Sequence, residues 1–156
     1  MQIRMATEQD FDAYIKVSEG TCYSMELNGS PKQNTMKTNC LMIHSKDKEK
    51  DMFSRLVKEE KMYVVEDEEE IVAFGAVGEE NRVCKILDFF VVRKHQRKGV
   101  GTFFVNSVIK AAKKKRMKKI VLYCEFKGAM EFWKKMGFKE KANRDIETQG
   151  NFEKIL

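Results

Sequence analysis

The chain has 156 residues and a net charge of +6 at neutral pH, with 42% hydrophobic and 35% charged residues. This balance is typical of a folded globular protein and excludes a disordered chain. The basic surplus suits nucleotides, nucleic acids and acidic membranes alike, so it selects no partner. No apolar run could span a bilayer and the N-terminus has no apolar signal region, so we expect a single cytoplasmic domain over residues 1–156 that is not bound to a membrane.

Apolar residues recur at strand and helix spacing along the chain. In order, they predict a strand at 2–6, a helix begun by Thr7 and its capping-box partner Asp10, a long irregular loop at 20–42, a helix at 46–60, strands at 62–66, 71–77 and 83–92, a helix at 99–115, a strand at 120–124, a helix at 129–136 that Gly137 ends, and closing strands from 138 and at 151–156. The short acidic turn after residue 66 implies antiparallel pairing, whereas the strand–helix–strand unit at 83–124 implies a parallel crossover. We therefore predict an α/β fold with a mixed sheet and helices on both faces.

A segment between a strand and a helix has the composition of an anion site. Gln96-Arg97-Lys98-Gly99-Val100-Gly101 leads into a helix whose first amides lack intrahelical acceptors and lie at the positive end of the helix dipole. The two glycines let phosphate oxygens approach the backbone, and the two basic residues add charge at the rim. The segment lacks both the dinucleotide fingerprint and the G-K-[ST] ending of a Walker loop. By itself, it fits a tight turn with a solvated basic rim equally well.

The surroundings of this segment resemble the GNAT acetyltransferases. The run Ile86-Leu87-Asp88-Phe89-Phe90-Val91-Val92 followed by Q-x-x-G-x-G looks like motif A of that family, and Ala129–Phe138 looks like motif B. The stretch from Asp88 to Val91 is particularly similar to the polyamine acetyltransferase branch. The resemblance implies a single-domain GNAT fold with a mostly antiparallel sheet, whose parallel strands splay apart near residues 91 and 124. It also implies acetyl-CoA as the cofactor.

The resemblance further implies the contacts of that cofactor, position by position. The backbone of Phe89, Phe90 and Val91 is expected to bind the thioester carbonyl and the pantetheine arm like an added strand. The remaining expected cofactor residues are Gln96, Arg97, Lys98, Gly99, Val100, Gly101 and Thr102 for the pyrophosphate, and Phe132 and Trp133 for the far end of the pantetheine. The implied reaction is direct attack of a primary amine on the thioester in a ternary complex, with strand amides stabilising the oxyanion.

Three positions depart from the pattern of the family. Phe126 replaces an asparagine that usually follows the fifth strand, and Leu87 replaces an acidic residue of the polyamine branch. Trp133 replaces the tyrosine that often protonates the departing thiolate, and an indole N–H cannot act as that acid. The cofactor site tolerates these changes better than the catalytic assignment does.

Side chains near the expected thioester are the candidates for proton transfer. Asp88 and Glu125 are the nearest carboxylates, with Glu66 next, and Tyr123 is the candidate for the missing acid. Each has a structural alternative: a solvated or ion-paired strand residue for Asp88, a strand-end cap for Glu125 and core packing for Tyr123. A dedicated acid is dispensable, since a thiol with a pKa near ~8.5 is a tolerable leaving group.

The remaining reactive or charged groups favour structural roles. Cys22, Cys40, Cys84 and Cys124 form no C-x-x-C pair, so we expect reduced thiols and no metal site. His44 and His95 are expected in loops, and the basic run Lys113–Arg116 at a solvated helix end. Two other functions stay open: a CoA-binding module without catalysis, and, less favoured, a basic nucleic-acid-binding protein. The acceptor, a small-molecule or peptide amine, should bind near residues 20–42 and the C-terminal strands; the sequence leaves its identity and a homodimer open.

Overall fold

The computed structural model describes residues 1–18, 46–141 and 150–156. They form two compact units, Met1–Phe74 with Phe90–Val100, and Gly75–Phe89 with Gly101–Leu156. The expected loop at 20–42, His44 and two of the cysteines lie outside the described residues. The prediction of one domain over residues 1–156 stays a prediction.

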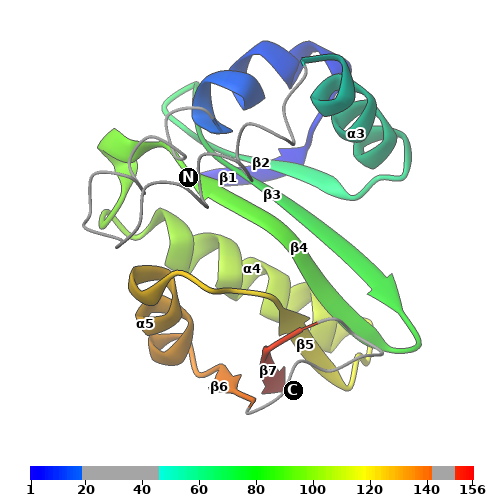
Figure 1. The fold of residues 1–156 in the computed structure, drawn as a ribbon, viewed down its shortest axis with the longest axis vertical. Helices are drawn as coiled ribbons and strands as arrows, with labels where there is room; N and C mark the ends of the chain where they lie inside the picture. The colour runs from blue at the N-terminus through cyan, green and yellow to red at the C-terminus, as the bar shows by residue number, and fades with distance from the viewer. Residues whose placement is uncertain (19–45, 142–149) are drawn as a thin grey trace, which may run out of the picture. The chain divides into compact units, whose positions relative to one another are not determined.

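Within these described ranges, seven strands form one sheet in the order β1-β2-β3-β4-β5-β7-β6 (Figure 1). The strands are β1 (Gln2–Met5), β2 (Met62–Asp67), β3 (Glu70–Glu80), β4 (Val83–Val91), β5 (Lys119–Leu122), β6 (Lys139–Glu140) and β7 (Phe152–Ile155). The helices are residues 11–18, α3 (Lys46–Lys58), α4 (Val100–Lys114) and α5 (Lys127–Lys135), with 3-10 turns η1 (Glu8–Asp10) and η2 (Arg93–His95). The α/β prediction with a mixed, mostly antiparallel sheet is confirmed.

Two-residue turns join β2 to β3 and β3 to β4. Both residues of each turn have positive φ: 49° and 66° at Glu68 and Glu69, and 49° and 63° at Asn81 and Arg82. This is the backbone of a type I′ hairpin turn, whose twist matches that of the flanking antiparallel strands. The hairpins therefore place the end of β4 beside the start of β3, and Val92 N–H donates to Val72 C=O at 2.9 Å.

An aromatic cluster forms the core of the first unit. Tyr14 packs against Phe53 of α3 and Phe74 of β3, with ring centroids 5.0 and 5.5 Å apart. Figure 1 shows residues 11–18 and α3 on the same side of β1 and β2. The expected capping box begins the 3-10 turn η1, which leads into the helix at 11–18: the Asp10 carboxylate accepts hydrogen bonds from Thr7 N–H and Oγ1 at 2.8 and 3.1 Å.

In the second unit, β5 pairs in parallel with β4 and antiparallel with β7. The two closing strands, β6 and β7, pair with each other as expected. Strand β7 also pairs with β5, so it lies between β5 and β6. Strand β5 ends at Leu122, two residues before the predicted end. Gly137, with φ of 82°, follows α5 as predicted for a C′ glycine.

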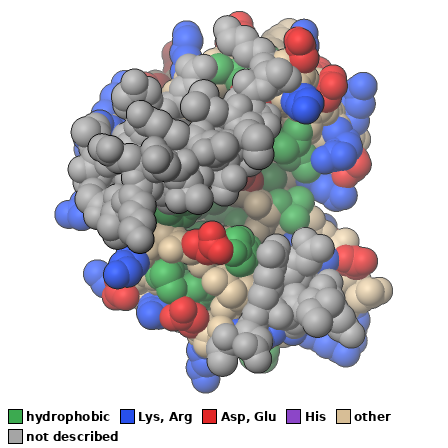
Figure 2. Space-filling view, in the orientation of Figure 1, with side chains coloured by type: hydrophobic (Ala, Val, Ile, Leu, Met, Phe, Trp, Pro, Cys, Tyr) green, Lys and Arg blue, Asp and Glu red, His purple; other side chains and the backbone are tan. Residues whose placement is uncertain are grey.

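Among the described residues, no helix is long and apolar enough to cross a membrane. On the face shown in Figure 2, basic and acidic side chains are interspersed.

Candidate functional site

Strands β4 and β5 separate before β4 ends. Their described ladder runs from Val83↔Lys119 to Ile86↔Leu122, while β4 continues to Val91. Within the described chain, the last five residues of β4 thus have no partner on β5. The expected splay of the parallel pair is present, but it begins after Ile86 and Leu122, earlier than the expected residues 91 and 124.

The end of β5 is bound to the C-terminal segment instead. The side chain of Asn151 accepts a hydrogen bond from Cys124 N–H and donates one to Cys124 C=O, both at 2.8 Å. Asn151 N–H also donates to Leu122 C=O at 3.0 Å. A Cβ at Gly150 would lie 3.0 Å from that carbonyl oxygen, so a side chain at this position would crowd the backbone of β5. Asn151 was not singled out in the sequence, because the distance along the chain hides its pairing with Cys124.

Strand β4 changes its side-chain alternation at the splay. A Cβ at Gly78 would contact Leu87, whereas one at Gly75 would collide with Phe104 of α4. Gly75 and Gly78 lie three residues apart, so they point to opposite faces of β3, and Leu87 lies on the face opposite α4. Yet Phe89 stacks on Phe104 with ring centroids 4.4 Å apart. Residues two apart on a regular strand share a face, so β4 is irregular between Leu87 and Phe89.

Asp88 lies at this irregularity. Its carboxylate accepts a hydrogen bond from Phe89 N–H at 2.9 Å. The side chain is half-buried, and burial raises the pKa of Asp88 to about 7, against the opposing effect of that hydrogen bond. A carboxyl that titrates near neutrality is suited to accepting a proton at physiological pH.

The two other carboxylate candidates differ from Asp88. Glu66 accepts hydrogen bonds from Gln2 at 2.9 Å and from Arg4 at 2.7 Å, and these hold the pKa of Glu66 below its usual range. It is therefore bound in a structural ion pair. Glu125 is exposed and accepts a hydrogen bond from the phenol of Tyr123. Tyr123 is 45% exposed, so the core-packing alternative for this residue is wrong.

The segment from Gln96 to Gly99 is exposed and precedes the N-terminus of α4. Its backbone turns through positive φ at Arg97 (59°) and Gly99 (86°). A Cβ at Gly99 would meet no atom within 4 Å, so the space beside this residue is open. The side chain of Gln96 donates to Val91 C=O at 3.1 Å and ties the segment to the end of β4. The backbone at Gly99 is therefore open to an approaching group, and the pyrophosphate role expected for this segment stays a prediction.

Gly101 and the motif B aromatics belong to a packed cluster. Trp133 is buried, and its ring lies 6.3 Å from that of Phe89, 5.0 Å from Phe132 and 5.3 Å from Phe138. A Cβ at Gly101 would lie 3.1 Å from the ring of Phe132. The glycine thus has a packing role within this unit that is separate from any phosphate contact. Thr102 is exposed in the first turn of α4, where Val100 is buried.

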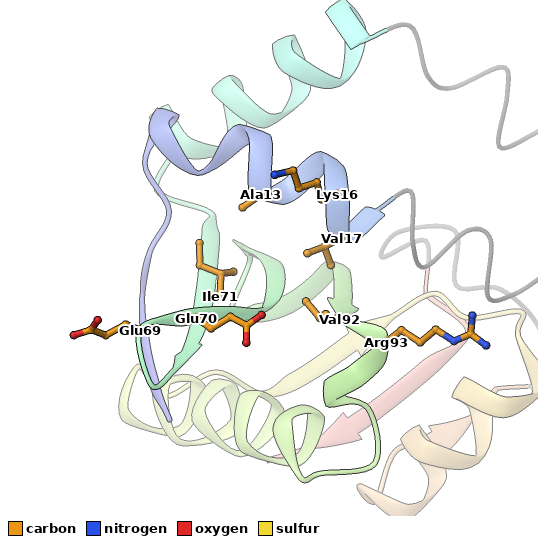
Figure 3. Close-up of a pocket in the computed structure, with 8 residues that line it drawn as sticks. All are labelled: Ala13, Lys16, Val17, Glu69, Glu70, Ile71, Val92 and Arg93. Atoms are coloured by element: carbon orange, nitrogen blue, oxygen red, sulfur yellow. The ribbon is translucent and has the colours of Figure 1, made fainter.

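A cavity of about 520 Å³ opens in the first unit next to the end of β4 (Figure 3). Val17, Ile71 and Val92 give it apolar walls, and charged residues surround it. One of these, Glu70, is engaged by Lys94 at 2.5 Å and His95 at 3.2 Å, contacts that hold the pKa of Glu70 below its usual range. His95 was expected in a loop; it lies in η2, and its side chain is 17% exposed beside Glu70.

The buried cysteines show no sign of a nucleophile. Burial raises the pKa of Cys84 to about 11 and also raises the pKa of Cys124. The thiol of Cys124 lies 3.7 Å from the Phe126 carbonyl oxygen. Thiols with raised pKa values hold few thiolates at neutral pH, so neither of these two cysteines is suited to act as a nucleophile.

Comparison with known proteins identifies relatives of the chain. Residues 32–138 match the acetyltransferase (GNAT) family. An uncharacterized N-acetyltransferase of Methanocaldococcus jannaschii is 38% identical over 65 residues, which are 40% of this chain and 29% of that protein. The match thus spans less than a third of this relative's length. Acetyl-CoA is the acetyl donor of the family, which confirms the cofactor prediction at the level of the family.

Solved structures share the fold at low identity. The PaiA N-acetyltransferase of Thermoplasma acidophilum, crystallised in complex with coenzyme A, gives a TM-score of 0.76 at 18% identity, covering 99% of this chain and 98% of that one. Ard1 of Thermoplasma volcanium gives 0.70 at 18% identity, covering 99% and 97%. These likenesses confirm the predicted fold. The closer likeness to the polyamine branch stays a prediction.

Proposed function

The chain belongs to the GNAT acetyltransferase family, and on that premise we propose that it transfers the acetyl group of acetyl-CoA to a primary amine by direct attack in a ternary complex. The observation that carries the proposal is the edge of β4 from Leu87 to Val91, which β5 leaves unpaired and which leads through η2 to the N-terminus of α4. An extended ligand with a phosphate end fits such an edge followed by a helix start.

The residues of the chain fit the cofactor in separate ways. The backbone groups of Phe89 and Val91 are suited to hydrogen-bonding the extended arm. The open space and positive φ at Gly99 suit the approach of phosphate oxygens, with Arg97 and Lys98 exposed beside it. When bound, acetyl-CoA supplies an activated acetyl thioester. The lack of a side chain at Gly101 is already explained by the aromatic rings beside it, so it is not evidence for a phosphate contact.

We assign proton transfer to Asp88. An alkyl amine is mostly protonated at neutral pH, so it must lose a proton before it can attack. The raised pKa of Asp88, about 7, makes its carboxylate a base of matched strength. Glu125, with Tyr123 bonded to it, is suited to holding the cationic amine before that transfer. The engaged state of Glu66 argues against that residue as the base.

A free-thiol assay tests the proposed reaction. Acetyl-CoA is supplied together with polyamines, amino acids, aminoglycosides or peptides with free N-termini, and the release of CoA thiol is followed. The proposal requires amine-dependent thiol release with at least one class, and an acetylated amine as product. Tight CoA binding without amine-dependent release would favour the alternative, a CoA-binding module. That alternative draws support from buried Trp133, which leaves no phenol at the usual acid position.

We also propose a cytoplasmic location.

A further inference from the structure

The edge of β4 that faces away from β3 is defined by backbone alternation. In an antiparallel pair, successive residues turn their N–H and C=O groups to opposite edges of the strand. Val92 N–H donates to Val72 C=O of β3. Val91, one residue earlier, and Phe89, three residues earlier, therefore turn theirs to the opposite edge. The described ladder with β5 ends at Ile86, so β5 does not pair with the backbone there.

Two side chains of the protein occupy this edge. The carboxamide of Gln96 donates to Val91 C=O at 3.1 Å, and the carboxylate of Asp88 accepts from Phe89 N–H at 2.9 Å. The groups that an added strand or an amide-bearing ligand would use are thus already engaged by the chain. Gln96 is exposed, so little packing holds its side chain in this position.

We propose that the side chain of Gln96 is a displaceable stand-in for the ligand on the free edge of β4 and so lowers the affinity of the site for the pantetheine arm. The inference rests on the proposed function for the identity of that ligand. A ligand N–H that binds Val91 C=O must first displace the carboxamide of Gln96. The net gain in binding free energy is therefore smaller than at a carbonyl bonded only to water. Gln96 is then a positioning residue that acts through the Val91 carbonyl.

The opposite expectation follows if Gln96 assists the ligand. A side chain that contacts the cofactor or orders the phosphate segment strengthens binding, and its removal weakens it. The direction of the change in affinity therefore separates the two roles. Gln96→Met keeps the length of the side chain and removes its hydrogen-bond donor.

The test is calorimetric titration of the wild type, Gln96→Met and a control with two ligands. One ligand is CoA, and the other is adenosine 3′,5′-diphosphate, which has phosphates but no pantetheine arm. Gln9→Met, the same exchange at an exposed position of η1, is the matched control. We expect Gln96→Met to bind CoA about threefold to tenfold more tightly, the value of one typical hydrogen bond, with unchanged affinity for the nucleotide.

The outcomes are distinguishable. Equal or weaker CoA binding by Gln96→Met overturns the proposal, and weaker binding of both ligands shows that Gln96 orders the phosphate segment instead. A wild type that does not bind CoA overturns the proposed function and the inference with it. Gln96→Leu replaces Gln96→Met in the same titration if the latter does not fold.

Discussion

Asp88 lies on the part of β4 that β5 leaves unpaired, and its carboxylate is the proposed base. Its raised pKa comes from burial, and its hydrogen bond to Phe89 N–H fixes its carboxylate at the irregular point of β4. We predict that Asp88→Asn lowers turnover about 100-fold to 10,000-fold, the usual cost of losing a positioned base, while CoA affinity changes little. Steady-state kinetics with the best acceptor and CoA titration measure the two quantities.

The dependence of turnover on pH gives a second test of the role of Asp88. A base must be ionised, so the wild-type rate should rise as pH increases through about 7 and the rise should be absent from Asp88→Asn. Glu125→Gln, which removes the other candidate carboxylate, serves as the comparison. Wild-type turnover by Asp88→Asn would exclude Asp88 as the base and leave Glu125 or water.

The same pKa predicts a change in stability. Because the folded pKa of Asp88 lies above the ordinary value of 3.8, the folded state holds its proton over a pH range in which the unfolded chain has lost it. The contribution of Asp88 to the free energy of unfolding therefore falls as pH rises from about 4 to about 7. The Tm of the wild type relative to that of Asp88→Asn should fall over this window. A constant difference would contradict the raised pKa.

At the scale of elements, the glycines on either side of the start of α4 have different roles. Gly99 has φ of 86° and open surroundings, whereas Gly101 lies against the ring of Phe132. Gly101→Val would disturb aromatic packing, so weaker CoA binding in that variant would not isolate a phosphate contact. Gly99→Ala strains only the backbone, by about 1–2 kcal/mol in the left-handed region.

We therefore predict that Gly99→Ala weakens CoA binding and lowers stability only slightly. The strained backbone shifts away from the geometry that presents its amides to the phosphates. Calorimetric titration and thermal unfolding measure the two effects. Gly128→Ala is the control, since a Cβ there also meets open space and its φ is not in the left-handed region. An unchanged affinity in Gly99→Ala would exclude this segment as the pyrophosphate site.

Asn151 holds the end of β5 in place of a longer strand. Asn151→Ala removes both hydrogen bonds to the Cys124 backbone, and we predict a loss of about 2–4 kcal/mol in the free energy of unfolding, because a part-buried N–H and C=O lose their partners. Urea denaturation measures the loss. Asn106→Ala, at an exposed position of α4, should change stability little. Equal stability of the two variants would show that water replaces the side chain of Asn151.

Hydrophobic periodicity predicted the positions of helices and strands well, but it predicted less well which face of a helix is buried. The amphipathic pattern placed α4 within one residue at each end. It did not decide which apolar residues are buried, since Ala111 is exposed while Val105 and Ala112 are buried. A helix of 3.6 residues per turn can rotate by part of a turn without breaking its pattern, so packing against the sheet decides the face. The pairing of strands in hairpins was easier to predict, because the turn and the two strands are adjacent in the sequence.

For the whole molecule, the sequence predicted the parts that depend on local or family-wide patterns. The fold class and the cofactor follow from the resemblance to the family, whereas β4 and β5 separate at Ile86 and Leu122, earlier than the expected residues 91 and 124. The pairing of Asn151 with Cys124 and of Arg4 with Glu66 could not be predicted, since each joins residues far apart in the chain. The irregularity of β4 was also hidden, because it shows only in which neighbours Leu87 and Phe89 contact.

Thermal unfolding with and without CoA tests the central claim most directly. A ligand that binds only the folded state raises Tm by mass action. At a ligand concentration of 100 times its Kd, the free energy of unfolding rises by about 2.7 kcal/mol. We predict that CoA and acetyl-CoA both raise Tm, and that Gly99→Ala needs more ligand for the same shift. A midpoint that saturating acetyl-CoA leaves unmoved, while a control nucleotide shifts it, would contradict the account.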